Sequence, residues 1–145
     1  MRVAAVCAAL LLTPIAAQAQ ERIQIPGAQA LAPYSPVVRA NGFVFVSGVI
    51  PYDHAKRAFV GGDIEVQVRQ ALANLDAALK AAGVGRAQVV KTTVFLRDAA
   101  DTQAMNRIYA EFFGHALPAR TVVPGVDWGR PELRIEIEAV AVDKR

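Results

Sequence analysis

The most regular spacing of apolar positions in the chain lies between residues 63 and 82. The apolar residues recur every three or four positions, which places them on one face of an α-helix. They are Ile64, Val68, Ala71, Leu72, Leu75, Ala78, Leu79 and Ala82. Asp63 is placed to cap the start of this helix and Gly83 to end it.

A second helix is predicted over residues 101–113, where the same spacing gathers large apolar side chains on one face. These side chains are Met105, Ile108, Tyr109, Phe112 and Phe113. Gly114 follows directly, at a position where glycine commonly ends a helix.

Runs of β-branched and aromatic residues predict the strands. Residues 37–40 and 43–49 form two such runs, and Asn41-Gly42 between them is the strongest short signal for a β-hairpin. Further strands are expected at residues 23–25, 89–96, 121–126 and 133–142. The prolines in residues 26–36 predict a loop, and residues 51–62 are expected to form a mobile hairpin loop.

The resulting order β-β-β-α-β-α-β-β predicts an α+β fold of two layers, with both helices packed on one face of the sheet. The other face of the sheet also needs cover. In a chain of 145 residues that is 54% hydrophobic, other subunits are the natural cover, so we expect a homo-oligomer.

The first 19 residues are typical of a signal peptide. Arg2 precedes an apolar stretch centred on Leu10-Leu11-Leu12, and Ala17-Gln18-Ala19 has the small-x-small pattern of a cleavage site. Cleavage after Ala19 would leave residues 20–145 as a single domain of 145 − 19 = 126 residues. The only cysteine, Cys7, would be lost with the signal, which suits a periplasmic or secreted protein.

The charge pattern argues against a nucleic-acid partner. The whole chain carries +3, and loss of Arg2 leaves 15 basic and 13 acidic residues, a net charge of +2. The charges alternate in sign without a basic run. His54 and His115 are far apart in sequence and lack metal-ligand spacing, so no metal is expected.

The strand at residues 133–142 carries the most informative polar positions. Alternation places Glu136 and Glu138 on one face, about 7 Å apart. Such a pair is either a solvated polar face or a carboxylate aimed into a cleft as a general acid or base.

Four further side chains are candidates for contact with a ligand. The guanidinium of Arg120 has the shape to bind a carboxylate through two parallel hydrogen bonds, although a surface arginine is the commoner outcome. Tyr34 and Ser47 lie at a loop and a strand end, and Asn106 lies early in the second helix. Each of these three has an ordinary structural explanation when taken alone.

Taken together, these segments resemble the RidA/YjgF family over essentially the whole of residues 20–145. The matching blocks are Ala32-Pro33-Tyr34, Val46-Ser47-Gly48-Val49-Ile50-Pro51, Ala81-Ala82-Gly83, Val90-Lys91-Thr92-Thr93-Val94-Phe95-Leu96, Met105-Asn106 through Phe113, Leu117-Pro118-Ala119-Arg120-Thr121, and Ile135-Glu136-Ile137-Glu138-Ala139-Val140-Ala141-Val142. The last two blocks are the most specific.

The resemblance implies a chorismate-mutase-like fold with a mixed sheet, a homotrimer with clefts between subunits, and hydrolysis of 2-imino or enamine acids to 2-oxo acids and ammonia. It assigns the substrate carboxylate to Arg120 and the activation of water to Glu136. It places Tyr34, Ser47, Asn106 and Val122 in the cleft. No cofactor, metal or nucleic acid is implied, and no membrane once the signal is removed.

The chain departs from the family pattern at several positions. Val122 stands where many members have cysteine, Val49 where many have glutamine, and the stretch at residues 124–130 with Trp128 is unusual. Three other functions remain open at this point. They are a non-catalytic periplasmic trimer that binds small carboxylates, RNA cleavage as ascribed to some relatives, and chorismate mutase chemistry by analogy of fold alone.

Overall fold

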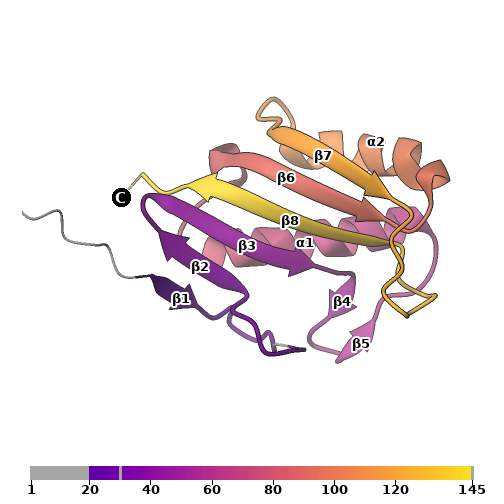
Figure 1. Cartoon of the computed structure of the whole chain (residues 1–145), viewed down its shortest axis with the longest axis horizontal. Coiled ribbons are helices and arrows are strands. Elements are labelled where there is room, and N and C mark those ends of the chain that lie inside the picture. Colours follow the sequence, from indigo (N-terminus) through magenta and orange to yellow (C-terminus); the bar gives the residue numbers. More distant parts are fainter. Residues whose placement is uncertain (1–19, 30, 145) are drawn as a thin grey trace, which may run out of the picture.

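The computed structural model describes residues 20–29 and 31–144, which form a main sheet covered by two helices and a small two-stranded sheet (Figure 1). The helices are α1 (Ile64–Ala81) and α2 (Thr102–Phe113), with short 3₁₀ helices η1 (Arg86–Gln88) and η2 (Ala99–Asp101). The strands are β1 (Glu21–Ile23), β2 (Val37–Ala40), β3 (Phe43–Val49), β4 (Tyr52–Asp53), β5 (Ala58–Phe59), β6 (Val89–Leu96), β7 (Ala119–Pro124) and β8 (Ile135–Val142).

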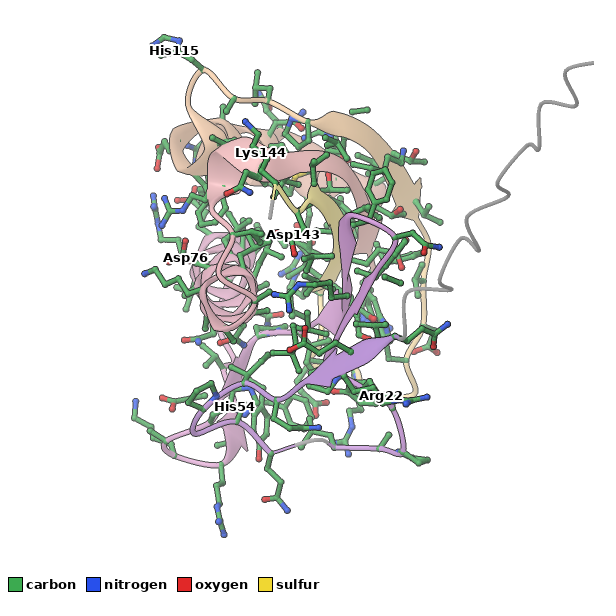
Figure 2. The ribbon with its side chains drawn as sticks, turned by 90° about the vertical axis from the view of Figure 1, so that its left-hand side faces the viewer. Arg22, His54, Asp76, His115, Asp143 and Lys144 are labelled. Carbon is green, nitrogen blue, oxygen red and sulfur yellow. The ribbon has the colours of Figure 1, made fainter. Side chains whose placement is uncertain are left out.

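The main sheet is mixed and has the strand order β1-β2-β3-β8-β6-β7. Neighbouring strands are antiparallel except for β6 and β7, which run parallel and are connected through α2. Both helices lie on the same side of the sheet (Figures 1 and 2). The predicted α+β class, with two helices on one face of a mixed sheet, is therefore confirmed.

The core lies between the helices and the sheet, and alternation along β8 shows how the sequence builds it. Ile135, Ile137, Ala139 and Ala141 are all buried against the helical layer. The residues between them, including Glu136 and Glu138, point to the opposite side of the sheet, because successive strand residues alternate in direction. We call this side the open face; its exposed aromatic residues include Phe43 and Phe45.

Capping and turn residues in the sequence account for the start of α1 and for the turn between β2 and β3. The side chain of Asp63 accepts a hydrogen bond from the backbone N–H of Val66 at 3.0 Å and caps α1, as predicted. Asn41 and Gly42 both have positive φ (50° and 77°), the conformation that a tight type I′ hairpin between β2 and β3 requires.

Several predicted boundaries are wrong. β1 begins two residues before the expected 23–25, because residues 21–23 pair with β2. β7 also begins two residues early, because Ala119 and Arg120 pair with Lys91 and Thr92 of β6. β8 begins at Ile135 rather than residue 133. The hairpin expected at residues 51–62, in contrast, is present as the small antiparallel pair β4–β5.

The predicted signal peptide at residues 1–19 lies outside the described residues. Across residues 20–29 and 31–144, none of the helices combines the length and the apolar character that a membrane crossing needs.

Candidate functional site

Glu136 lies in the wall of a cavity of about 400 Å³ at one end of the open face. The cavity is lined by Leu31, Tyr34, Ser47, Gly48, Ile50, Phe59, Trp128, Arg130, Leu133 and Glu136. Its volume is in the range of pockets that hold small ligands, and its wall is mostly apolar with a few polar groups. Tyr34, Ser47 and Glu136, predicted separately from the sequence, therefore share one cavity.

Gly48 makes room for the carboxylate of Glu136. A Cβ atom at position 48 would lie 1.7 Å from Glu136 Oε1, so any side chain there would displace the carboxylate. The pairing of β3 with β8 shifts between Val46 and Val49, so that Ser47 and Gly48 together oppose Glu138. This β-bulge keeps Gly48 on the open face, directed at Glu136.

Trp128 holds the other oxygen of the same carboxylate. Its indole Nε1–H donates a hydrogen bond to Glu136 Oε2 at 2.6 Å. Trp128 belongs to the segment between β7 and β8, and Arg97 fastens this segment to the sheet. The Arg97 guanidinium donates to the backbone oxygens of Leu133 and Arg130 at 2.7 Å each, and it pairs with Asp127 at 3.0 Å.

Asp127 and Arg97 also interact electrostatically next to Trp128. The hydrogen bond from Arg97 holds the pKa of Asp127 below its ordinary value, and the backbone N–H of Gly129 acts in the same direction. Because this carboxylate is highly exposed, the pair contributes mainly to the shape of the segment rather than to stability.

Ser47 contributes to the cavity by holding its rim. Its hydroxyl donates to the backbone oxygen of Ser35 at 2.8 Å, and its backbone N–H donates to that of Pro36 at 3.0 Å. These two bonds tie the loop that carries Tyr34 to the end of β3. Tyr34 remains 45% exposed at the mouth of the cavity, where its ring is accessible to a ligand.

Arg120 lies on the other side of the sheet. It is exposed on the edge strand β7, with its guanidinium carbon 4.7 Å from the centre of the Tyr109 ring and Nη1 3.8 Å from the sulfur of Met105. Both contacts are made with α2. No carboxylate within the described part of the chain pairs with Arg120, so its donors other than the one that Nη1 directs at the Met105 sulfur are available to a ligand.

The ring under Arg120 is fixed from the core. The Tyr109 hydroxyl and the Thr92 hydroxyl share a hydrogen bond of 2.6 Å, and Thr92 is fully buried. Burial raises the pKa of Tyr109 above its ordinary value of 10.0, against the opposing effects of the Thr92 hydrogen bond and the positive charge of Arg120. Tyr109 is therefore a neutral support for the arginine at physiological pH.

Within one chain, Arg120 and Glu136 point to opposite faces of the sheet. Arg120 is level with Thr92 in the parallel register and contacts α2, whereas Glu136 is level with Phe95 and opens to the cavity on the open face. Strand β6 lies between the two strands that carry them. The predicted meeting of the two groups therefore requires a second copy of the chain.

The remaining predicted residues divide in the same way. Asn106 is exposed on α2, and Val122 lies two residues after Arg120 on β7, partly buried against the core. Both are on the side of Arg120. Glu138 is exposed on the open face and lines a separate hollow with Val38, Phe45 and Lys91. It is therefore outside the Glu136 cavity.

The two histidines lie at opposite ends of the molecule (Figure 2). In the described residues, no group of three or more His, Cys, Asp or Glu side chains is arranged to hold a metal ion. The donors near Glu136 are instead an indole N–H and a guanidinium, which interact with anions rather than cations.

Sequence reasoning missed Gly48, Trp128 and Arg130 as parts of the cavity. Gly48 lies inside a recognised block, but its closeness to Glu136 depends on the bulge. Trp128 is the only tryptophan and lies eight residues before Glu136, in a segment that the prediction noted only as unusual. Arg130 lies over the Phe59 ring at 4.6 Å and pairs with Glu132.

Comparison with known proteins gives consistent matches across the domain. The family model described as Endoribonuclease L-PSP matches residues 25–143. A RutC family protein of Pyrococcus horikoshii is 44% identical over 111 residues, covering 77% of this chain and 87% of the relative. The human 2-iminobutanoate/2-iminopropanoate deaminase is 40% identical over 115 residues, covering 78% and 82%.

A solved structure agrees with the fold. E. coli TdcF with bound serine superposes with a TM-score of 0.78 at 31% identity, covering 86% of this chain and 99% of that protein. The fold implied by the sequence blocks is therefore confirmed.

Proposed function

Because the chain belongs to the Endoribonuclease L-PSP family, which is the RidA/YjgF family that its sequence blocks resemble, we propose that it hydrolyses small 2-imino acids to 2-oxo acids and ammonia. Relatives named as a 2-iminobutanoate/2-iminopropanoate deaminase and as a 3-aminoacrylate deaminase support this class of substrate. The serine bound to TdcF supports a site of the size and polarity needed for a small amino-acid-like molecule.

The observation that carries the proposal is the placement of Arg120 and Glu136 on opposite faces of one sheet, each accessible from outside the chain. We infer that each active site forms between two copies. One copy provides Arg120, Asn106 and Val122, and the next provides Glu136 with Tyr34 and Ser47. Head-to-tail contacts of this kind close into a ring, and the family resemblance gives the ring three members.

Each group has a defined role in the proposed reaction. Arg120 binds the substrate carboxylate through two hydrogen bonds and so fixes the neighbouring C=N carbon opposite Glu136. A water molecule beside Glu136 attacks that carbon. One water proton passes to Glu136 as the C–O bond forms, and the π electrons of C=N move to nitrogen, which takes up a proton.

The resulting carbinolamine breaks down to the products. Its hydroxyl loses a proton and its nitrogen takes one up, so that the hydroxyl becomes the carbonyl as the C–N bond breaks and ammonia leaves. One imine and one water thus yield one 2-oxo acid and one ammonia. Such imines hydrolyse slowly in water unaided, so positioning and one general base, which contributes roughly 10²–10⁴-fold, are sufficient.

The surface charge does not favour RNA cleavage, although the family is described as an endoribonuclease family. Arginines across the described surface are already paired with carboxylates: Arg39, Arg69, Arg86, Arg97, Arg107, Arg130 and Arg134. Binding of a phosphate backbone needs unpaired cations that gather along one surface.

The test is turnover of imines that an amino-acid oxidase generates in situ from alanine, 2-aminobutyrate, leucine and phenylalanine. Semicarbazide traps the remaining imine, and the enzyme's effect is read as loss of semicarbazone. We expect Arg120→Ala and Glu136→Gln to lose at least about 100-fold in kcat/KM, as expected when a charged group that binds or activates is removed.

Arg69→Ala is the matched control, because Arg69 is an exposed arginine paired with Glu111 away from both halves of the site. Its activity should equal that of the unsubstituted protein. Unchanged turnover by Arg120→Ala would refute the assigned role. Binding of 2-oxo acids without any imine turnover by the unsubstituted protein would identify a non-catalytic binding protein instead.

A further inference from the structure

The two oxygens of the Glu136 carboxylate have different surroundings within one chain. Oε2 accepts the indole hydrogen bond of Trp128 at 2.6 Å. Oε1 is the atom nearest to the position that a side chain at Gly48 would occupy, 1.7 Å away. Because position 48 is glycine, Oε1 can lie against the backbone there. Within the described residues Oε1 has no hydrogen-bond partner, whereas Oε2 has a fixed one.

The indole is suited to hold a carboxylate without taking part in proton transfer. Its N–H is a donor only, so it neither accepts a proton from a carboxylic acid nor competes with the carboxylate for a proton of water. A hydrogen bond to an ionised acceptor is also stronger than one between neutral groups. The bond therefore orients Glu136 without the indole itself giving or taking a proton in the reaction.

Trp128 itself is held in place by groups outside the cavity. The Arg97 side chain donates to the backbone oxygens of Arg130 and Leu133, which follow Trp128 in the chain. It also pairs with Asp127, which directly precedes Trp128. The guanidinium carbon of Arg97 also lies 5.8 Å from the centre of the Trp128 ring. The indole is thus a fixed donor rather than a side chain of a freely moving loop.

We propose that Trp128 is a positioning residue that fixes Oε2 of Glu136, so that Oε1 alone accepts the proton of the attacking water. This inference rests on the proposed function. A glutamate side chain has three rotatable bonds, and without the indole the carboxylate would spend part of its time turned away from the water. The proton moves from water to Oε1 as the water oxygen bonds to the imine carbon.

The kinetic test compares Trp128→Phe with Trp128→His. Phenylalanine keeps an aromatic wall but has no N–H, so kcat should fall about tenfold while KM changes less than about threefold, as when an interaction that aids the chemical step is lost. Histidine has a ring nitrogen at the same number of bonds from the backbone as the indole nitrogen. Trp128→His should therefore recover much of kcat when it is measured near pH 8, where an unperturbed imidazole is neutral.

A spectroscopic test detects the hydrogen bond itself. The chain has a single tryptophan, so ¹⁵N-labelled protein gives one indole cross-peak that needs no assignment by mutation. Glu136→Gln should move this peak upfield in the proton dimension, because a carboxylate acceptor is replaced by a weaker neutral one. Addition of 2-oxobutanoate should move the same peak in the unsubstituted protein.

The outcomes separate the two claims. Lack of imine turnover by the unsubstituted protein overturns the proposed function, and this inference with it. If that protein is active, a Trp128→Phe variant with unchanged kcat overturns the positioning role alone. A Trp128→Phe variant whose KM rises while its kcat stays the same also overturns it. So does an indole peak that Glu136→Gln does not move.

Discussion

Glu136 receives a hydrogen bond from an indole at 2.6 Å and lies against a glycine, whereas Arg120 rests on an aromatic ring and a sulfur atom at the edge of the sheet. The surroundings of Glu136 are thus specific and directional, whereas those of Arg120 support the side chain and use only one donor, in a weak hydrogen bond from Nη1 to the Met105 sulfur. Both groups belong to the same sheet, but they point to opposite faces.

The difference matches what each group is proposed to do. A base has to present one oxygen to a water molecule in a fixed direction, so its orientation is determined inside the chain. A guanidinium that binds an incoming carboxylate has to keep its donors free until the substrate arrives. In the proposed assembly, each chain therefore provides the glutamate half of one site and the arginine half of the next.

The strongest test of this comparison is complementation between two inactive variants. Arg120→Ala and Glu136→Gln chains, unfolded together in equal amounts and refolded, should regain about a quarter of the unsubstituted activity. In a random mixture about one cleft in four receives both intact groups, one from each neighbour. Each variant refolded alone is the control, and activity that stays at background in the mixture would show that both groups act within one chain.

A methyl group at Gly48 tests the carboxylate half alone. Gly48→Ala should lower kcat by about tenfold or more, because the added Cβ would take the space of Glu136 Oε1 and turn the carboxylate away. Gly61→Ala is the matched control, since a Cβ there meets nothing within 4 Å and the backbone is not in the left-handed region. Circular dichroism should show both variants folded. Equal activity of the two would mean that Glu136 does not need its present position.

The arginine half is tested through the buried bond beneath it. Thr92→Val leaves the Tyr109 hydroxyl without its partner and should lower the free energy of unfolding by about 1–3 kcal/mol. The double variant Thr92→Val/Tyr109→Phe removes both polar groups and should recover most of this loss. Denaturant unfolding measures each value. The indole signal of Trp128 should stay unchanged in both, because it lies on the other face of the sheet.

The smallest expected effect concerns Asp76 on α1, labelled in Figure 2. The hydrogen bond from Arg86 holds the pKa of Asp76 below its ordinary value of 3.8, against the effect of burial, and Lys80 acts in the same direction as Arg86. A carboxyl with a lowered pKa in the folded state stabilises above its unfolded pKa, and this stabilisation is lost as the pH falls through the lowered value.

Asp76→Asn should therefore lower Tm by a few degrees at pH 6, and the difference should shrink at pH 3. Thermal unfolding followed by circular dichroism at the two pH values measures it. Imine turnover at pH 7 should be unaffected, because Asp76 belongs to neither half of the site. A difference in Tm that is the same at both pH values would contradict the linkage.

Short-range patterns determined most of the fold in advance. The apolar spacing that predicted α1 is the spacing that the core uses, and Asn41-Gly42 adopts the positive φ angles that its residue types favour. β7 was misplaced because its first residues, Ala119 and Arg120, have little strand preference of their own. They become part of a strand only through pairing with β6, which is distant in sequence.

The candidate site was predictable in its residue types but not in its assembly. Glu136 and Arg120 stand in recognisable blocks, yet the faces to which they point depend on strand order and register. Trp128 was not predicted as a partner of Glu136. Its position depends on hydrogen bonds from the Arg97 side chain to backbone oxygens of a segment that has no periodic pattern. Such hydrogen bonds require no regular spacing of residue types, so the sequence carries no pattern that indicates them.

The bulge at Ser47 and Gly48 makes this part of β3 sensitive to length as well as to residue type. Deletion of either residue would leave one residue opposite Glu138 and restore regular pairing, with Val49 still opposite Ile137. The backbone at this point would then lose the bulge that directs Gly48 at the Glu136 carboxylate. A one-residue change at residues 26–29, before the part of the loop that lines the Glu136 cavity, should be tolerated far better, so random insertion and deletion libraries should recover functional variants from there and none from this point of the strand.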